Sequence, residues 1–433
     1  MKVAFATLGC RVNIYESEAM TEKFKSEGYD VVDFDEKAEV YVINTCTVTN
    51  MGDKKSRQYI SKAKKKNPEA VVAVVGCYSQ TSPDEVSAIE GVDVVLGTRN
   101  KGDIVYYVNR AMDTKEKFVV VKDVLRNKVF EELKIEDFEG KTRAFLKVQD
   151  GCNRFCSYCL IPYARGAVCS KNPETIIDEV NKLADNGFKE IILSGIHIAS
   201  YGVDLEERKT LMDIIEEIHK INGIKRIRIG SVEPRFFTDE VIEKMASMEK
   251  MCPHFHLSLQ SGCDATLKRM NRKYTAEEYF NTVVKLRERI PNVSITTDVI
   301  VGFPGETAEE FNETFNYLKE LRVAKMHIFK YSPRKGTKAA DMKDDVHGTI
   351  KEERSKLLQE LDRENEKNFI QDFIGEKLEV LVEEKLKDDN RYIGYTSNYI
   401  KVIIDSTEDI VGKIITVRLI ENKGDYATCT IES

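Results

Sequence analysis

The sequence predicts an α/β fold in three parts: an N-terminal parallel α/β sheet, a central partial (β/α)6 barrel and a small C-terminal β-barrel. Three observations lead to this expectation. Buried apolar runs alternate with amphipathic helical segments over residues 1–110. The same alternation returns over residues 143–332, this time with six apolar runs. Short strand-like runs separated by turns then follow one charged helix and fill residues 370–433.

Domain bounds follow from these patterns. We expect an N-terminal domain over residues 1–110, a connector rich in Lys, Asp and Glu over residues 111–140, a barrel domain over residues 141–369 and a terminal domain over residues 370–433. In the N-terminal domain, strands are expected at residues 3–7, 40–44, 71–75 and 92–96, and helices at residues 16–26 and 55–66.

Six strands are expected in the central part, at residues 144–148, 190–193, 226–229, 254–258, 294–301 and 325–331. Helical segments such as residues 173–186 and 308–321 separate them. Folds of this kind build their sites at the carboxyl ends of the strands, so the side chains that follow each strand are candidates for function. A charged helix at residues 351–368 then precedes terminal strands at residues 378–383, 399–404 and 414–419.

The composition is that of a globular protein. Hydrophobic residues make up 42% of the chain and charged residues 32%, and no apolar run has the length of a membrane span. Residues 1–8 read as a first strand rather than a signal peptide, so we expect a cytoplasmic protein without a membrane partner. Because disulfides are rare there, the ten cysteines favour metal binding or catalysis. The net charge of −7 means that any RNA partner has to be met by local basic patches.

A C-x3-C-x2-C motif, formed by Cys152, Cys156 and Cys159, follows the first predicted barrel strand. Three thiolates on one short loop can hold three irons of a [4Fe–4S] cluster and leave the fourth iron open to a ligand. A structural zinc site needs a fourth protein ligand, and the next cysteine, Cys169, comes ten residues later. The motif therefore predicts an iron–sulfur cluster with one open iron.

A second set, Cys10, Cys46 and Cys77, is widely separated in sequence, but each member lies just beyond a predicted strand. Strand ends at one edge of a parallel sheet lie side by side, so three thiolates would converge there, with Gly9 and Gly76 easing the turns. A single buried cysteine is usually a small packing residue. Three at equivalent strand ends predict a second metal centre, again with three protein ligands.

Four stretches of sequence around these cysteines are shared with a known family. They are Thr7-Leu8-Gly9-Cys10-Arg11-Val12-Asn13, Asn44-Thr45-Cys46-Thr47-Val48-Thr49, Val75-Gly76-Cys77, and the segment from Asp150-Gly151-Cys152 to Pro162-Tyr163-Ala164-Arg165-Gly166. With them the chain resembles the radical S-adenosylmethionine (SAM) methylthiotransferases over essentially its whole length, and its β-rich tail resembles a TRAM domain, an RNA-binding module. One departure is Ala167-Val168-Cys169-Ser170-Lys171, where family members commonly carry arginines.

This resemblance implies two [4Fe–4S] clusters and SAM as cofactors. One SAM molecule would methylate a sulfur held on the open iron of the N-terminal cluster. A second would be cleaved at the cluster of the C-x3-C-x2-C motif to give a 5′-deoxyadenosyl radical. The resemblance also implies an external electron donor and a sulfur donor whose identity is unknown.

Three branches of the family differ in substrate: isopentenyladenosine in tRNA, an aspartate of a ribosomal protein, and threonylcarbamoyladenosine (t6A) at position 37 of tRNA. The stretch around Cys10 and the segment Lys54-Lys55-Ser56-Arg57-Gln58 are most similar to the third branch. The resemblance thus implies methylthiolation of t6A at C2 in a tRNA partner, with the other two substrates as alternatives.

Side chains that follow the second to sixth barrel strands are candidates for binding SAM: Ser194, Gly195, Glu233, Gln260, Asp298 and Gly302. The glycines allow close backbone approach, and the carboxylate and amide groups can bind ribose hydroxyls or an amino group. The resemblance adds Tyr158, which would pack near the adenine. Ordinary turn chemistry at a barrel rim is the alternative for each of them.

One basic helix is the candidate for tRNA contact. Its proposed RNA-binding residues are Lys54, Lys55, Arg57, Lys65 and Lys66. No acid interrupts residues 54–66, and such a face attracts phosphate, although a merely solvated helix face is the alternative. Residues 268–273 form a second basic run. In the terminal domain, thirteen acidic residues outnumber eight basic ones, so its RNA role rests on the resemblance and on tyrosines that could stack on bases: Tyr392, Tyr395 and Tyr399.

The remaining histidines and cysteines are expected to be structural. His254 and His256 share one face of a predicted strand and are taken as core residues, and no histidine spacing indicates a metal site. The thiols outside the two sets are Cys169, Cys252, Cys263 and Cys429. Two other classes of protein stay open: a non-catalytic RNA-binding protein held together by zinc, and a radical enzyme that inserts sulfur without methylation.

Overall fold

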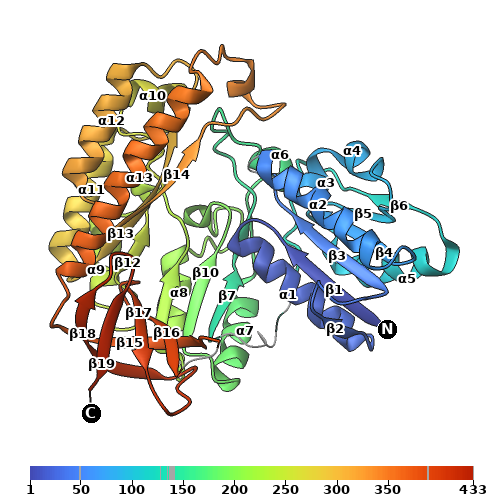
Figure 1. Cartoon of the computed structure of the whole chain (residues 1–433), viewed down its shortest axis with the longest axis horizontal. Coiled ribbons are helices and arrows are strands. Elements are labelled where there is room, and N and C mark those ends of the chain that lie inside the picture. The colour runs from blue at the N-terminus through green and yellow to red at the C-terminus, as the bar shows by residue number, and fades with distance from the viewer. Residues whose placement is uncertain (48–49, 127, 134, 136–141, 388–389, 433) are drawn as a thin grey trace.

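The three predicted parts occur in the predicted order, which confirms the fold class (Figure 1). The computed structural model describes the chain except for residues 48–49, 127, 134, 136–141, 388–389 and 433. Two residues of the Cys46 motif, Val48 and Thr49, and part of the predicted connector therefore lie outside the described residues.

The N-terminal sheet has six parallel strands in the order β2-β1-β3-β4-β5-β6. The strands are β1 (Lys2–Thr7), β2 (Asp30–Val32), β3 (Val40–Thr45), β4 (Val71–Gly76), β5 (Val94–Leu96) and β6 (Phe118–Val120). The helices are α1 (Arg11–Ser26), α2 (Asn50–Lys66), α3 (Cys77–Thr81), α4 (Pro83–Ser87), η1 (Lys101–Asp103) and α5 (Ile104–Thr114). Every residue of β3 and β4 is buried, as expected for central strands covered on both faces by helices.

Several N-terminal elements differ from the sequence prediction: helix α2 begins five residues earlier than expected, and helices α3, α4 and α5 were not predicted. The edge strands β2 and β6 were not predicted, because each has three residues and neither has an unbroken buried pattern. β6 lies within the segment expected to be a connector and pairs with β5. Helix α1 begins at Arg11, five residues earlier than expected, directly after Cys10.

The central part is an open barrel of six parallel strands. They are β7 (Arg143–Lys147), β10 (Glu190–Ser194), β11 (Arg226–Ile229), β12 (His254–His256), β13 (Ser294–Val301) and β14 (Lys325–Lys330). They form two three-stranded sheets, β7-β10-β11 and β12-β13-β14, which are joined by single bridges between Ile227 and Met251 and between Val232 and Leu257. All six predicted strands are therefore present.

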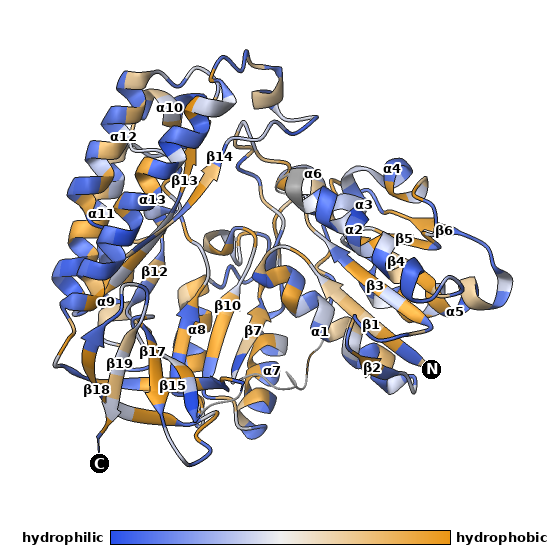
Figure 2. Cartoon of the chain, in the orientation of Figure 1, coloured by the Kyte–Doolittle hydropathy of each residue, from blue (hydrophilic) through white to orange (hydrophobic). Residues whose placement is uncertain are grey.

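Helices cover the outside of this barrel: α7 (Pro173–Asp185), α8 (Leu211–Lys220), α9 (Asp239–Ala246), α10 (Asp264–Arg269), α11 (Ala276–Arg289), α12 (Ala308–Leu321) and α13 (Gly348–Gln371). Short elements complete it: β8 (Gln149–Asp150), α6 (Ile161–Arg165), β9 (Cys169–Ser170), η2 (Ile198–Ser200), η3 (Pro234–Phe236) and η4 (Lys338–Asp341). Figure 2 shows hydrophobic residues along the strands and polar residues on the outer faces of helices such as α11 and α12. The helices thus turn an apolar stripe towards the sheet.

The terminal domain is a closed five-stranded barrel in the order β15-β16-β17-β19-β18. Its strands are β15 (Lys377–Lys385), β16 (Arg391–Thr396), β17 (Lys401–Asp405), β18 (Ile414–Asn422) and β19 (Ala427–Ile431). It lies beside the first residues of the central strands (Figure 1), where Arg226 donates to the backbone oxygens of Tyr395 (3.0 Å) and Glu379 (2.8 Å). Among the described helices, none combines the length and apolar character needed to cross a membrane.

Candidate active site

The N-terminal cysteines lie at one edge of the first sheet. Cys10, Cys46 and Cys77 follow the carboxyl ends of β1, β3 and β4, which are neighbours in the sheet. The register pairs Thr7 with Asn44 and places Thr45 opposite the last residue of β4, so the three ends are level. The structure therefore brings the three loops together, although the cysteines are far apart in sequence.

Close backbone contacts hold these loops in place. A Cβ atom on Gly9 would lie 2.7 Å from Cβ and 2.9 Å from Sγ of Cys46, so only glycine fits between the two loops. Asn13 Nδ2 donates to the backbone oxygen of Leu8 (2.6 Å) and to that of Thr45 (3.0 Å). The amide of Asn13 thus ties the Cys10 loop to the Cys46 loop.

The second set lies on the loop between β8 and α6. Cys152, Cys156 and Cys159 are half-buried, and all ten cysteines of the chain are free thiols. The backbone N–H of Arg154 donates to Cys152 Sγ (3.4 Å), and Arg272 Nη1 donates to Cys156 Sγ (3.3 Å). Burial raises the pKa of Cys152 to about 11 and that of Cys159 to about 12, so a bound metal has to displace their protons. Three thiols with N–H donors to sulfur fit an iron–sulfur cluster.

The basic run at residues 268–273 supports this cysteine loop rather than forming a positive surface. Arg269 pairs with Glu310 at 2.5 Å, and Asn271 Nδ2 donates to the backbone oxygen of Phe155 at 2.9 Å. Arg272 is buried and faces the loop. The charges of the two arginines in this run are therefore used inside the protein.

Glu233 is the predicted cofactor residue that lies beside the cysteine loop. Its carboxylate is 3.1 Å from Arg154 Nε, 3.2 Å from His197 Nε2 and 3.4 Å from Arg272 Nη2. Although burial raises its pKa, the hydrogen bond from His197 and the charges of Arg272 and Arg154 lower it to about 2. Glu233 is therefore an ionised, firmly oriented carboxylate next to Cys156.

Three other predicted cofactor residues contact the protein itself. Tyr158 packs on Phe303, with ring centroids 6.4 Å apart. A Cβ on Gly302 would lie 2.3 Å from Cγ of Lys351, so this glycine makes room for a lysine stem. Gln260 is buried at a φ of +75°, and its backbone N–H donates to the Asp298 carbonyl (2.8 Å).

A cavity of about 750 Å³ lies where the three domains meet. Three predicted cofactor residues line it: Ser194, Gly195 and Asp298. The N-terminal domain contributes Cys10 and Arg11, and the terminal domain contributes Tyr395, Tyr399 and Lys401. The cavity therefore connects the N-terminal cysteine edge with the inside of the barrel.

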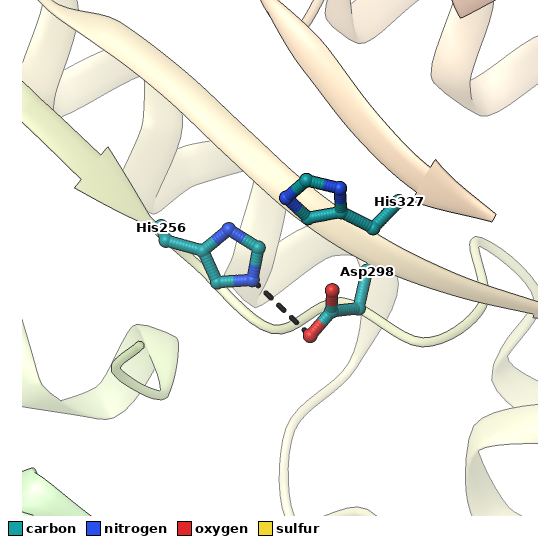
Figure 3. Close-up of side chains that lie close together, drawn as sticks. All are labelled: His256, Asp298 and His327. Atoms are coloured by element: carbon teal, nitrogen blue, oxygen red, sulfur yellow. Dashed lines mark ion pairs between the residues drawn. The ribbon is translucent and has the colours of Figure 1, made fainter. Parts of the chain in front are cut away.

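Asp298 lies in this cavity with two histidines from neighbouring strands (Figure 3). His256 Nε2 is 3.1 Å from Asp298, while His256 Nδ1 is 2.9 Å from Thr296 Oγ1. Ligand atoms of His256, Asp298 and His327 all lie within 4.8 Å of one another. His256 is buried, as expected for a core residue, but the expectation missed its polar partners in the cavity. Its partners lie on other strands, so sequence spacing gave no signal.

The tyrosines of the terminal domain pack against the central barrel. Tyr399 stacks between Tyr395 (ring centroids 5.0 Å apart) and His254 (4.6 Å), and the Arg228 guanidinium lies 4.6 Å from the Tyr399 ring. Tyr392 is buried inside the terminal barrel. Burial excludes Tyr392 from stacking on RNA bases, whereas Tyr395 and Tyr399 line the cavity and their stacking on bases stays a prediction. His254 is buried, as expected, and packs against Tyr399.

The proposed RNA-binding helix, α2, presents most of its cations to solvent. Four of them are exposed: Lys54, Lys55, Arg57 and Lys65. All of these except Lys55 also line a shallow groove. Arg57 also donates to Tyr78 Oη (2.9 Å). Lys66 is half-buried and lies 3.5 Å from Asp35.

Sequence reasoning missed a buried charge network between the first two domains, formed by Glu16, Lys101, Lys147, Asp150 and Arg165. Glu16 Oε1 lies 2.5 Å from Arg165 Nη1 and 2.8 Å from Lys147 Nζ, and Lys147 lies 2.7 Å from Asp150. Arg165 Nη2 also donates to Asn13 Oδ1 (2.6 Å). The network therefore links the barrel to the residue that joins the Cys10 and Cys46 loops. Its signal was present in the family motifs, which contain Asn13 and Arg165.

Three family models match consecutive parts of the chain. The Uncharacterized protein family UPF0004 model matches residues 2–97, the Radical SAM superfamily model residues 146–318 and the TRAM domain model residues 371–431. In solved structures, the radical S-adenosylmethionine methyltransferase TsrM from Kitasatospora setae, bound to cobalamin and a [4Fe–4S] cluster, has a TM-score of 0.56. It is 15% identical, covers 77% of this chain and 76% of its own, and shows likeness of fold alone.

Full-length relatives are more similar. The threonylcarbamoyladenosine tRNA methylthiotransferase MtaB of Bacillus subtilis is 46% identical over 98% of this chain and 96% of its own length. The protein of the same name in Aquifex aeolicus is 44% identical over 96% of this chain and 100% of its own. The tRNA-2-methylthio-N(6)-dimethylallyladenosine synthase of Alkaliphilus oremlandii is 38% identical over 97% of this chain and 90% of its own.

Proposed function

This chain belongs to the radical SAM methylthiotransferase family, and from that premise we propose that it transfers a methylthio group to C2 of t6A at position 37 of tRNA. The observation that carries the choice of substrate is the difference in identity. The chain is 46% and 44% identical to two threonylcarbamoyladenosine enzymes, against 38% for a dimethylallyladenosine synthase matched over the same length.

The family uses a [4Fe–4S] cluster together with SAM. We assign that cluster to Cys152, Cys156 and Cys159, and a second cluster to the N-terminal cysteines. Free thiols on neighbouring loops support both assignments, and the N–H donors to sulfur support the first. When bound, these groups supply the radical and sulfur-transfer chemistry that an unreactive aromatic C–H bond requires.

The chain's own residues orient these groups. Arg272 donates to the sulfur of Cys156 and also lies 3.4 Å from Glu233, so one guanidinium couples the thiol to the ionised carboxylate. We infer that Glu233 receives the amino group of SAM, since its carboxylate is already charged. The other predicted cofactor contacts stay part of the proposal: Tyr158, Ser194, Gly195, Gln260, Asp298 and Gly302.

Positioning of the two cysteine loops falls to the buried charge network. Arg165, which follows the Cys152 loop, reaches Asn13, and Asn13 bonds to the Cys10 and Cys46 loops. Such a connection supports a fixed separation between the two cysteine loops, so that one substrate could be reached from both. The cavity between the domains would shield the reaction from bulk water.

We further infer a tRNA path along α2, where Lys54, Lys55, Arg57 and Lys65 are exposed and Lys66 lies close by. The enzyme would work in the cytoplasm, where its tRNA substrate is found, with an external electron donor and a separate sulfur donor.

The test is an anaerobic assay with the protein reconstituted in iron and sulfide. The protein is incubated with SAM, a reductant and tRNA that bears t6A, and the digested nucleosides are analysed by mass spectrometry. We expect a nucleoside heavier by one methylthio group in place of hydrogen. A product formed only from isopentenyladenosine tRNA would contradict the assignment of t6A as the substrate. Purified protein that contains zinc but no iron would contradict the assignment as a radical SAM enzyme.

A further inference from the structure

One arginine in the cavity lacks a partner. Arg11 is the first residue of α1, directly follows Cys10 and lines the cavity while being half-buried. Across the part of the chain that the structure describes, its guanidinium has neither an ion pair nor a hydrogen bond. A partly buried guanidinium normally binds a carboxylate or phosphate in a fork-like, two-point contact. The free fork of Arg11 therefore indicates an anionic group on whatever occupies the cavity.

Two of the three carboxylates that line the cavity have close partners, and the third, Asp425, acts on Lys325. Glu366 pairs with Lys325, which also lies 3.7 Å from Asp362. Asp298 faces His256 at 3.1 Å. None of these acids is directed at Arg11, so its positive charge stays available to a ligand.

The barrel wall beside Tyr399 is also rich in positive charge. Three arginines, Arg143, Arg226 and Arg228, share two carboxylates, Glu190 and Glu383. Burial raises the pKa of Glu383 to about 7, against the opposing charge of Arg143. Near neutral pH, the carboxylates therefore do not fully neutralise the three arginines. This potential favours a negatively charged ligand in the cavity.

We propose that the cavity binds the threonylcarbamoyl arm of the substrate nucleoside and that Arg11 pairs with the terminal carboxylate of that arm. This proposal rests on the function proposed above, because the arm belongs to t6A. The arm carries a ureido group, a hydroxyl and a carboxylate. Arg11 meets the carboxylate, while His256 and His327 offer donors and acceptors to the ureido and hydroxyl groups.

Position and size agree with this assignment. Arg11 is next to Cys10, so an arm bound there lies beside the N-terminal cysteine edge, where the modified adenine has to approach. A volume of about 750 Å³ lies in the range of pockets that enclose small ligands.

The same groups would exclude an apolar arm. An isopentenyl group would leave the guanidinium of Arg11 without a partner, and it would give His256 and His327 no bond beyond those they make within the protein. Sites built for polar groups reject analogues that lack them much more strongly than apolar pockets reject polar ones. The cavity thereby provides a physical basis for choosing between two modified adenosines.

The experiment uses the reconstituted full-length enzyme and tRNAs assembled around a synthetic anticodon segment. One tRNA carries t6A with a free carboxylate, and the other carries the methyl ester of the same arm. Wild-type enzyme should have a KM about ten- to a hundredfold lower for the acid, the effect of one buried charge-assisted contact. This comparison needs no variant and is independent of protein folding.

Variants then locate the contact. Arg11→Gln should raise KM for the acid into the range of the ester and lose the preference between them, whereas Arg11→Lys should keep part of it. Lys401→Gln tests the lysine of the terminal domain that lines the same cavity and lies over the Tyr426 ring. Lys319→Gln, at an exposed lysine of α12 outside the cavity, is the control. Iron content of each variant reports whether the clusters are intact.

Two results would overturn the proposal. One is an equal KM of the wild-type enzyme for the acid and the ester. The other is that Lys401→Gln loses the preference for the acid while Arg11→Gln keeps it. Failure of the proposed function gives a different result. The wild-type enzyme would then modify neither the tRNA with the acid nor the tRNA with the ester, and it would act on isopentenyladenosine tRNA instead.

Discussion

At the scale of residues, Glu16 and three cationic side chains lie together in a site that water does not reach. Lys101, Lys147 and Arg165 all contact its carboxylate, and none of the four side chains is exposed. Although burial raises its pKa, the charges of Arg165, Lys101 and Lys147 hold it well below the usual range. Glu16 is therefore ionised in the folded protein and compensates charges that would otherwise be costly to bury.

Replacing this carboxylate should destabilise the chain strongly. Glu16→Gln is expected to lower the free energy of unfolding by about 3–5 kcal/mol, because Lys147 and Arg165 then share only Asp150 and Lys101 loses its ion pair. Urea denaturation measures the change. The control is Glu217→Gln, which removes an exposed pair with Lys220 and should cost less than about 1 kcal/mol.

The pH dependence of Glu16 has a defined sign. Because its pKa is lower in the folded than in the unfolded protein, its contribution is present at neutral pH and is lost as the pH falls below about 4. Glu16→Gln should therefore reduce the acid sensitivity of the protein. Two results would contradict this account of the network. One is an equal loss of stability in Glu16→Gln and Glu217→Gln, and the other is an unchanged dependence of stability on acid pH in Glu16→Gln.

The two cysteine sets should separate in their effects. Cys152→Ala should abolish production of 5′-deoxyadenosine from SAM, whereas Cys10→Ala should retain it and lose only the methylthiolated nucleoside. Each variant should hold about four irons instead of about eight. Cys429→Ala, a half-buried thiol of the terminal barrel, is the control and should keep both the iron and the product. Normal iron content in Cys10→Ala would contradict a second cluster.

At the scale of elements, helix α2 combines a structural end with an open face. Asp53, near its start, pairs with Arg334 of the barrel domain at 2.7 Å, which anchors the helix across the domain boundary. Its last turn is held by Asp35, which accepts from Lys62 and lies near Lys66. The exposed cations between these anchors are therefore presented on a fixed helix rather than on a mobile loop.

That face should govern tRNA affinity. A Lys54→Ala, Lys55→Ala, Lys65→Ala variant is expected to raise KM for tRNA about tenfold. It should also lower the dependence of log affinity on log salt by about two to three units, because each lysine that binds a phosphate contributes about one unit. Titration of tRNA at several salt concentrations measures both. Lys319→Ala, an exposed lysine on α12, is the control. An unchanged salt slope would mean that α2 is merely a solvated face.

At the scale of the whole molecule, the terminal barrel is bound to the central barrel through arginines. Arg226 donates to backbone oxygens of β15 and β16, and Arg228 donates to the backbone oxygen of Ser397 (3.1 Å). Arg143 lies 2.7 Å from Glu383. These contacts use backbone acceptors and one partly exposed carboxylate, so the interface is polar and its strength depends on pH.

Glu383 gives that dependence its direction. Burial raises its pKa to about 7 in the folded protein, so stability should fall as the pH rises from about 4.5 through 7 and should level off above that. Glu383→Gln should flatten this part of the profile, as measured by denaturation at a series of pH values. Its exposed neighbour provides the control, Glu384→Gln, which should leave the profile unchanged.

The sequence predicted most of the fold because most elements are long and strongly patterned. The strands β11 and β13 and helix α12 have the predicted bounds. The strands missed are those that depend on tertiary pairing: the three-residue edge strands β2 and β6, and β16 and β19, which close the terminal barrel only by pairing with other strands. The helix α5 was missed as well, because it lies across the predicted end of the N-terminal domain.

The candidate site was predictable only where one loop or one set of strand ends carries the signal. Strand-end placement was enough to associate Cys10, Cys46 and Cys77. It could not reveal that His256 and His327 meet Asp298, because nothing in their spacing relates three different strands. Nor could it show that Tyr399 faces the central barrel, since that depends on how two domains dock.

The order in which the domains are synthesised has a consequence for the cavity. Tyr395, Tyr399, Lys401 and Asp425 form part of its wall, and all four follow the first sheet and the central barrel in the sequence. A nascent chain can fold its first sheet and its central barrel while this wall is still missing. Enclosed radical chemistry therefore becomes possible only after the terminal barrel has been made and has docked, and a product truncated before it carries both cysteine sets without the chamber that would confine their reactivity.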